Sequence, residues 1–414
     1  MEKDYYCSQK FDTLDIRLSD GWVLSCCKAE GDRLTTKLLD SDPQGFFNWP
    51  RLVEERQMML DNKRVPGCEK ACWVPEDNGL VSRRIEERNL ISGDDDEHNI
   101  MEIRSPETQV PKYQGVRHLP KVINLMTSTT CNLTCSYCFK GLSSTWLKDV
   151  AEHGDYNIPG HSDRYNLSNF DRVIQHSSQR LQGQTAISTK IMQQLEQNID
   201  AIETLVLTGG EPLLFSGLEK LINMFAGKQI VVYTGLGVPE NTLRKMLPLL
   251  EKATEIFVSA ENTGKYHEFN RYGNSYSNFV KNFELLKQHC KRVTFTATIS
   301  NLTLFDFPNF AEKHHDIAQK INLCYDPVFF NPSLMDNESK DTICQQLEKV
   351  SPKFARSLVP VIQAREVPGD REKLSAFLKR FTASRNLDLN IFPKSFLSWI
   401  DSPSPKFIPI REDK

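Results

Sequence analysis

The stretch TSTTCNLTCSYCFK, residues 127–140, decides the fold class of this chain. It places Cys131, Cys135 and Cys138 in the spacing C-x-x-x-C-x-x-C. Three thiolates on one short loop can hold three irons of a cubane cluster. Zinc takes four ligands and needs another Cys or His close by, which this loop does not supply. The spacing therefore favours a [4Fe–4S] cluster with one iron left open to a small molecule.

Outward from this loop, strand patterns alternate with helix patterns from about residue 120 onward. Such β–α units in series predict a parallel sheet with right-handed crossovers. The predicted strands are residues 122–128, 204–210, 229–235, 255–261, 292–299 and 320–326, and the predicted helices between them are residues 190–199, 217–225, 239–252, 276–289 and 302–316.

The cysteine loop, with the aromatic Tyr137 before its last cysteine, resembles that of radical S-adenosylmethionine (SAM) enzymes over roughly residues 118–330. The resemblance implies an α/β fold, a partial (β/α)6 barrel of TIM type. In that family the open iron binds the amino and carboxylate groups of SAM. One electron from the cluster then cleaves SAM to methionine and a 5′-deoxyadenosyl radical, which abstracts hydrogen from the substrate. The cofactor supplies this chemistry, while the protein positions the reactants and excludes water.

A second motif of the family follows in the expected order. The segment Gly209-Gly210-Glu211-Pro212 resembles the GGEP motif that contacts the methionyl amino group. Glycines let a backbone approach a ligand closely, and a glutamate accepts hydrogen bonds from an ammonium group. A plain Gly-Gly turn after a strand is the structural alternative.

Further residues resemble the contacts that the family makes with the rest of SAM. Ser259 and Glu261 lie two residues apart, on one face of a predicted strand, and resemble the ribose contacts. Arg271 resembles the arginine that pairs with the SAM carboxylate through a charge-assisted bond. Ile299 is a candidate to pack on adenine, with a core isoleucine as the alternative.

Two residues of the sixth predicted strand are candidates for the reaction itself. Asp326 closes that strand, and active sites of such barrels lie at the carboxyl ends of the strands. A turn-capping aspartate is the alternative. Cys324 is a strand thiol that could donate a hydrogen atom, although a buried apolar thiol is the default interpretation.

The segment before the barrel carries a second group of cysteines. Its β-hairpin followed by a helix resembles the twitch element of radical SAM enzymes, a shortened relative of the SPASM domain, although most relatives carry it after the barrel. The resemblance implies an auxiliary [4Fe–4S] cluster, with a zinc site as the alternative. Cys27 is the spare thiol, or it exchanges roles with its neighbour. The implied ligands are Cys7, Cys26, Cys68 and Cys72.

The amino-acid composition indicates which classes of protein this chain can belong to. The chain is 39% hydrophobic and 25% charged, which is typical of a globular protein. A net charge of −3 gives no overall field that would attract nucleic acid or an anionic membrane. No apolar run or secretory leader is evident, which predicts a cytoplasmic protein. Eleven cysteines in that compartment indicate metal or redox chemistry.

The domain organisation follows from these segments. We expect an auxiliary-cluster domain (1–75), a polar connector (76–118), a radical SAM core (119–335, with an insertion at 139–190) and C-terminal helices with a Pro-rich tail (336–414).

The leading hypothesis is an oxidoreductase-type radical SAM enzyme that oxidatively modifies a peptide or protein side chain. The insertion would recognise the substrate, and a donor such as flavodoxin or ferredoxin would supply electrons. The alternatives are the same chemistry on a small metabolite or carbohydrate, and a non-catalytic iron–sulfur or zinc protein.

Overall fold

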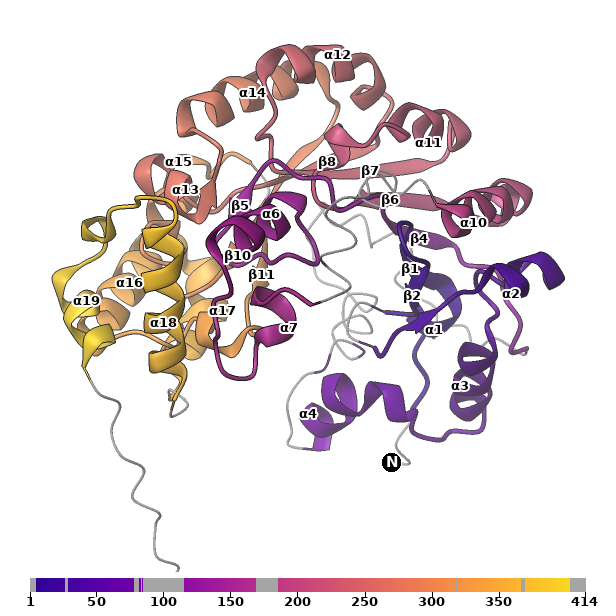
Figure 1. Ribbon diagram of the computed structural model, residues 1–414, viewed down its shortest axis with the longest axis horizontal. Helices are drawn as coiled ribbons and strands as arrows, with labels where there is room; N and C mark the ends of the chain where they lie inside the picture. Colours follow the sequence, from indigo (N-terminus) through magenta and orange to yellow (C-terminus); the bar gives the residue numbers. More distant parts are fainter. Residues whose placement is uncertain are drawn as a thin grey trace, which may run out of the picture. The chain divides into compact units, whose positions relative to one another are not determined.

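The protein divides into two compact units. The computed structural model describes residues 5–26, 29–77, 82, 84, 115–168, 185–317, 319–365 and 369–402. The first unit comprises residues 1–129, 178–232 and 252–254, and the second comprises residues 130–177, 233–251 and 255–414. Figure 1 labels the helices and strands of both.

The first unit is built on a sheet that combines parallel and antiparallel strands. β4 lies between β6 and β1 and pairs in parallel with both, and β6 pairs in parallel with β7. β1, β2 and β3 are antiparallel. The strand order is β7 (Gln229–Thr234), β6 (Thr204–Thr208), β4 (Val122–Met126), β1 (Thr13–Arg17), β2 (Trp22–Leu24) and β3 (Asp32–Arg33).

The predicted N-terminal hairpin exists, but it extends the barrel sheet. Leu14 and Ile16 of β1 lie in register beside Ile123 and Leu125 of β4. All four side chains are buried, so the hairpin continues the apolar face of β4. Burying this continuous face stabilises the arrangement, because a two-stranded hairpin alone is at best marginally stable in water.

The helices of the first unit include α10, whose start carries a capping box made by Thr185 and Ser188. Its buried Gln194 accepts from the backbone N–H of Phe46 at 3.0 Å and donates to the carbonyls of Leu39 and Asp42, which joins α10 to the region of α2. The α-helices are α1 (Gln9–Asp12), α2 (Thr36–Ser41), α3 (Pro50–Leu60), α4 (Val74–Asp77), α10 (Ala186–Gln197) and α11 (Leu218–Met224).

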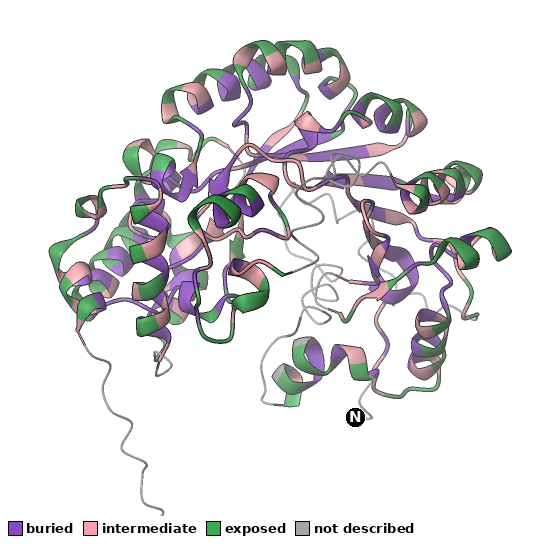
Figure 2. Cartoon of the chain, viewed as in Figure 1, coloured by how far each residue is buried: buried purple, intermediate pink, exposed green. Residues whose placement is uncertain are grey.

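The second unit contains three parallel strands and a short antiparallel ribbon. β10 (Val293–Ile299) pairs in parallel with β8 (Glu255–Ser259) and β11 (Gln319–Leu323), and β5 (Thr134–Cys135) pairs with β9 (Arg271–Tyr272). β8 and β10 are mostly buried, whereas β11 is only partly buried. Figure 2 shows that the helices expose one face. The helices are α6 (Ser144–His153), α7 (Ser162–Tyr165), α12 (Glu240–Leu250), α13 (Gly264–Asn270), α14 (Tyr276–His289), α15 (Phe307–Lys313), α16 (Asn337–Val350), α17 (Pro352–Ile362), α18 (Asp370–Ala383) and α19 (Lys394–Asp401).

All six predicted barrel strands and the five predicted helices between them are present. Most strands end one to three residues before the predicted boundary, as at β6, where the chain leaves the sheet at Gly209. The helix predicted over residues 302–316 begins only at Phe307.

The interpretation of the chain after residue 385 as a Pro-rich tail is wrong for its described part. α19 begins directly after Pro393, and its Phe396 and Ile400 are buried one turn apart. The Phe396 ring lies 4.8 Å from the Phe305 ring, so packing on the second unit stabilises this helix.

A buried histidine in α13 makes the stability of the second unit depend on pH. His267 is fully buried against Phe279, and burial lowers its pKa to about 3. The unfolded chain takes up this proton below about pH 6.5, whereas the folded chain does not until about pH 3. Between pH 6 and pH 4, this histidine should lower the unfolding free energy by on the order of 1 kcal/mol for each pH unit of acidification. We expect the variant His267→Phe to lack this loss. Denaturant titrations at several pH values measure this.

The matched control is His315→Phe, because His315 is exposed. Equal acid sensitivity of His267→Phe and the unmodified protein would contradict the assignment.

Candidate active site

The cysteine loop of the second unit is held in place through its backbone. Cys131 donates its N–H to Ser144 Oγ at 3.1 Å, and its carbonyl accepts from the hydroxyls of Ser144 and Thr145. Trp146 Nε1 donates to the carbonyl of Cys135 at 2.9 Å. The start of α6 therefore fixes the loop while using none of its sulfur atoms.

The three thiols of this loop are partly exposed and close enough to influence one another. Burial raises the pKa of Cys138, the neighbouring Cys135 and Cys131 raise it further, and Arg271 lowers it. Three such thiolates repel one another, and bound iron ions would remove that repulsion. The loop therefore fits a cluster that spreads its thiolate ligands over separate irons.

A site for a single metal ion differs from such a cluster, because all of its ligands must point at one ion. Within the described ranges, the structure contains no set of three or more Cys, His, Asp or Glu side chains placed to hold a single metal ion.

Three predicted SAM contacts meet in one buried group. Arg271 contacts Glu261 through two hydrogen bonds, Nε to Oε1 at 3.1 Å and Nη2 to Oε2 at 2.8 Å. Tyr137 donates its hydroxyl to Glu261 Oε1 at 2.9 Å, and its ring lies 5.6 Å from the Arg271 guanidinium. The Glu261 and Arg271 side chains are 0% and 4% exposed. Their pairing was not predicted, because ten residues and a helix separate them.

The pair also connects to the cysteine loop through the ribbon. Arg271 lies opposite Cys135 in the β5–β9 register. Burial raises the pKa of Tyr137 well above its ordinary value, so its hydroxyl stays protonated and donates. The Arg271–Glu261–Tyr137 group is therefore a hydrogen-bonded set of side chains, two of them charged, with a fixed geometry beside Cys135.

The GGEP segment belongs to the first unit, and the structure gives a reason for its first glycine. Gly209 has a φ of +152°, and a Cβ there would lie 2.8 Å from the carbonyl oxygen of Ser128. Gly210 donates its N–H to the same oxygen at 2.9 Å. Gly209 therefore lies close to the chain's own backbone at Ser128, in addition to any ligand that it approaches.

The acidic residue of that segment is buried at a helix start. Glu211 is 1% exposed, and its Oε1 accepts from the N–H of Leu213 at 3.1 Å. This bond caps the short 3-10 helix Pro212–Leu214. A carboxylate can accept several hydrogen bonds at once, so a capping role does not conflict with an ammonium ligand.

The remaining candidates of the barrel occupy strand ends of the second unit. Ser259 ends β8 and is half-buried, and Ile299 ends β10 and is fully buried. Cys324 is buried directly after β11. Asp326 is 67% exposed and forms an ion pair with Arg164 from α7, a contact that the sequence did not predict.

The N-terminal thiols of the first unit share a hydrophobic cluster. Cys7, Cys68 and Cys72 pack with Tyr6 and Trp73. Burial, together with smaller contributions from Cys7 and Cys72, raises the pKa of Cys68 to about 12, so the three thiols lie near one another.

Cys26 follows β2 and is partly exposed, and Cys27 lies outside the described residues. The buried ammonium of Lys10 lies near this group of thiols. Lys10 donates to Ser25 Oγ at 3.0 Å and to Glu55, and its charge lowers the pKa of Cys68.

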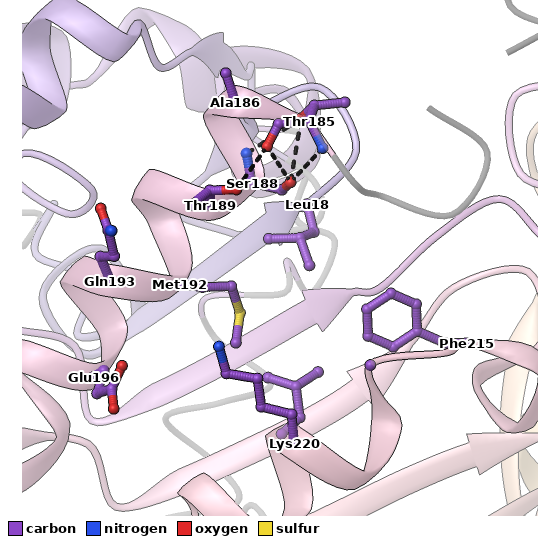
Figure 3. A pocket seen from close by; sticks show the side chains of 12 residues that line it. Leu18, Thr185, Ala186, Ser188, Thr189, Met192, Gln193, Glu196, Phe215 and Lys220 are labelled. Carbon is purple, nitrogen blue, oxygen red and sulfur yellow. Dashed lines mark hydrogen bonds between the residues drawn. The ribbon is translucent and has the colours of Figure 1, made fainter. Parts of the chain in front are cut away.

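One pocket of the first unit contains none of the predicted site residues. It has a volume of about 640 Å³ and lies between α10 and α11 (Figure 3). Leu18, Met192 and Phe215 give it apolar walls, and Glu196 and Lys220 add one charged group of each sign to its lining. No motif in the sequence indicated this pocket.

The parallel strands and the three-cysteine loop agree with the resemblance of the sequence to radical SAM enzymes. Residues 125–313 match the family model of the radical SAM superfamily, so the chain contains a radical SAM domain. The match confirms the predicted fold class and family, whose cofactors are a [4Fe–4S] cluster and SAM.

Several solved structures are similar to this chain. anSMEcpe with bound AdoMet has a TM-score of 0.36 and 13% identity over 57% of this chain and 61% of that chain, so the match spans less than two thirds of its length. Streptococcus suis SuiB bound to precursor peptide SuiA has a TM-score of 0.34 and 12% identity over 96% and 78% of the two chains. TYW1 with a lysine-pyruvate adduct has a TM-score of 0.28 and 14% identity over 55% and 73%. No curated protein sequence matches.

A separate finding concerns membranes. Among the described helices, none combines the length and apolar character needed to cross a bilayer.

Proposed function

We propose that this protein is a radical SAM enzyme that holds its cluster through Cys131, Cys135 and Cys138 and oxidatively modifies a peptide or protein side chain. The observation that carries the proposal is the loop of three mutually interacting thiols beside the buried Arg271–Glu261 pair. When bound, the cluster and SAM supply an organic radical that removes hydrogen from the substrate.

The chain's own residues position and shield these groups. Arg271 binds Glu261 through Nε and Nη2, and its Nη1 is the group that would donate to the SAM carboxylate. Glu211 accepts from the SAM ammonium, and Ser259 with Ile299 contacts the adenosine part. Burial of the Glu261–Arg271 pair excludes water and strengthens these charge-assisted bonds.

A peptide substrate fits the surface that follows β11 and the cysteine loop. Tyr325 and Val328 are 46% and 41% exposed, and Leu142 is 37% exposed. Asp326, which forms an ion pair with Arg164 of α7, lies on the same segment as Tyr325 and Val328. Exposed apolar groups next to charges suit an extended chain better than a small polar metabolite.

The test is anaerobic incubation of the reconstituted protein with SAM and dithionite, with 5′-deoxyadenosine measured by mass spectrometry. The proposal expects this product, together with loss of hydrogen mass from a candidate peptide. A protein with full iron content that forms no 5′-deoxyadenosine would refute it. Product without any peptide turnover, but with loss of hydrogen from a metabolite or carbohydrate, would move the substrate to that class.

We further propose that Cys7, Cys26, Cys68 and Cys72 hold an auxiliary [4Fe–4S] cluster, which accepts the electron left after hydrogen abstraction, and that flavodoxin or ferredoxin reduces the enzyme. Replacing all four cysteines by alanine is expected to lower the iron content from about eight to about four per chain. Metal analysis of anaerobically purified protein measures this change.

Single-residue variants, analysed by the same metal measurement, distinguish the two adjacent cysteines. Cys26→Ala is expected to reduce the iron content, and Cys27→Ala is the matched control beside it. About four irons plus one zinc in the unmodified protein, with zinc lost from the fourfold variant, would replace the auxiliary cluster by a zinc site.

A further inference from the structure

Arg385, two residues after the end of α18, lies outside the segment that matches the family and is almost completely buried. Its side chain is 2% exposed. Nη2 forms an ion pair with Asp149 Oδ2 at 2.9 Å, and Nη1 donates to the hydroxyl of Tyr156 at 3.0 Å. Tyr156 in turn donates to Asp149 at 3.3 Å. One arginine from the C-terminal helices thus neutralises a buried carboxylate of α6.

The same guanidinium reaches the ribbon that carries the cysteine loop. Nε donates to Thr134 Oγ1 at 3.3 Å, and Thr134 precedes Cys135 in β5. The Arg385 guanidinium also lies 5.5 Å from the ring of Tyr272, which is the β5–β9 partner of Thr134. Both strands of the ribbon therefore contact one buried cation.

A third contact links Arg385 to the loop through an aromatic ring. The guanidinium lies 4.8 Å from the centre of the Trp146 ring, and Trp146 Nε1 donates to the carbonyl of Cys135. Cation–aromatic contacts of this kind are strongest where water is excluded. Arg385 thus contacts three residues next to the backbone of Cys135, namely Thr134, Tyr272 and Trp146.

We infer that Arg385 is a positioning residue for the cluster-binding loop. This inference rests on the proposed assignment of Cys131, Cys135 and Cys138 as cluster ligands. Arg385 acts through Thr134, Trp146 and Asp149, and it makes the C-terminal helices part of the cluster site. Residues that orient metal ligands typically change metal affinity by about 10–100-fold when removed.

The experiment compares Arg385→Met with Arg385→Lys and with the control Lys379→Met, which alters a 70% exposed side chain of the preceding helix α18. We expect Arg385→Met to lose the SAM-responsive electron-spin signal to a chelator at least about 10-fold faster than the unmodified protein. Arg385→Lys should restore part of the difference because it keeps the charge beside Asp149. Lys379→Met should show no change.

A second measurement uses protein without any cluster. We expect amide hydrogens of residues 131–138 to exchange faster in Arg385→Met, while amides of α14 keep their rates. This readout needs no cluster. If the unmodified protein binds no SAM-responsive cluster, the proposed function fails, and the exchange rates still decide whether Arg385 orders the loop.

Two milder substitutions cover the case in which Arg385→Met does not fold. Tyr156→Phe and Thr134→Val each remove one hydroxyl that contacts Arg385 while keeping the shape of the side chain. Smaller changes in the same direction would support the inference. Unchanged loop exchange and unchanged chelator resistance in both variants, or in a folded Arg385→Met, would overturn it.

Discussion

Replacing Cys135 by serine is expected to abolish 5′-deoxyadenosine formation, down to the level of a protein-free control. The substitution removes one of the three proposed iron ligands and changes little else. The bonds that hold this residue, from Trp146 Nε1 and from the β5–β9 pairing, use its backbone and persist in the variant. The loss would therefore report the chemistry of the thiolate and not the folding of the loop. A serine hydroxyl is a poor iron ligand because it is not ionised at neutral pH.

Two measurements separate this effect from general damage. The iron content of Cys135→Ser should fall to about four per chain, which is the auxiliary cluster alone. The control is Cys344→Ala, because Cys344 is a buried thiol of α16 with no proposed role. It should keep full iron content and full product formation. Substantial product from Cys135→Ser would remove this cysteine from the ligand set.

The parallel strands could be predicted because their signals are local. β4, β6 and β8 each combine an apolar run with the following glycine or polar residues, which is the expected pattern of a buried parallel strand. The C-x-x-x-C-x-x-C loop was equally evident, because all three thiols lie within eight residues. The match over residues 125–313 agrees with both.

The contacts between distant segments could not be predicted. Arg385 lies 251 positions from Thr134, and no pattern in the sequence pairs a helix-end arginine with a particular threonine. The ion pair of Arg164 and Asp326 spans 162 positions. α19 was missed because Pro393 and the surrounding prolines indicated a tail, whereas Phe396 and Ile400 gain enough from burial to favour the helix.

The role of Glu261 illustrates how tertiary structure revises a motif-based prediction. Its position two residues after Ser259 predicted a ribose contact. In the structure both of its oxygens accept from Arg271, and one also accepts from Tyr137. A carboxylate with this many partners holds the arginine in one orientation. We therefore expect its substitution to affect SAM binding mainly through Arg271.

Replacing Arg271 by methionine is expected to have the second large effect, because it leaves the Glu261 carboxylate buried without its cation. Breaking a buried ion pair in this way typically costs about 3–5 kcal/mol of unfolding free energy. SAM affinity should fall about 10–100-fold, because a charge-assisted hydrogen bond contributes roughly 1.5–3 kcal/mol. Chemical denaturation and equilibrium binding of SAM to the reconstituted protein measure the two losses separately.

The double variant Glu261→Gln/Arg271→Met distinguishes the two roles of the arginine. It removes the unpaired charge together with the cation, so most of the lost stability should return. SAM affinity should stay low, because Arg271, the proposed partner of the SAM carboxylate, is still missing. If affinity returned together with stability, Arg271 would act only by neutralising Glu261, and the SAM carboxylate would require another partner. If the single variant lost stability but bound SAM normally, direct contact between Arg271 and SAM would be refuted in the same experiment.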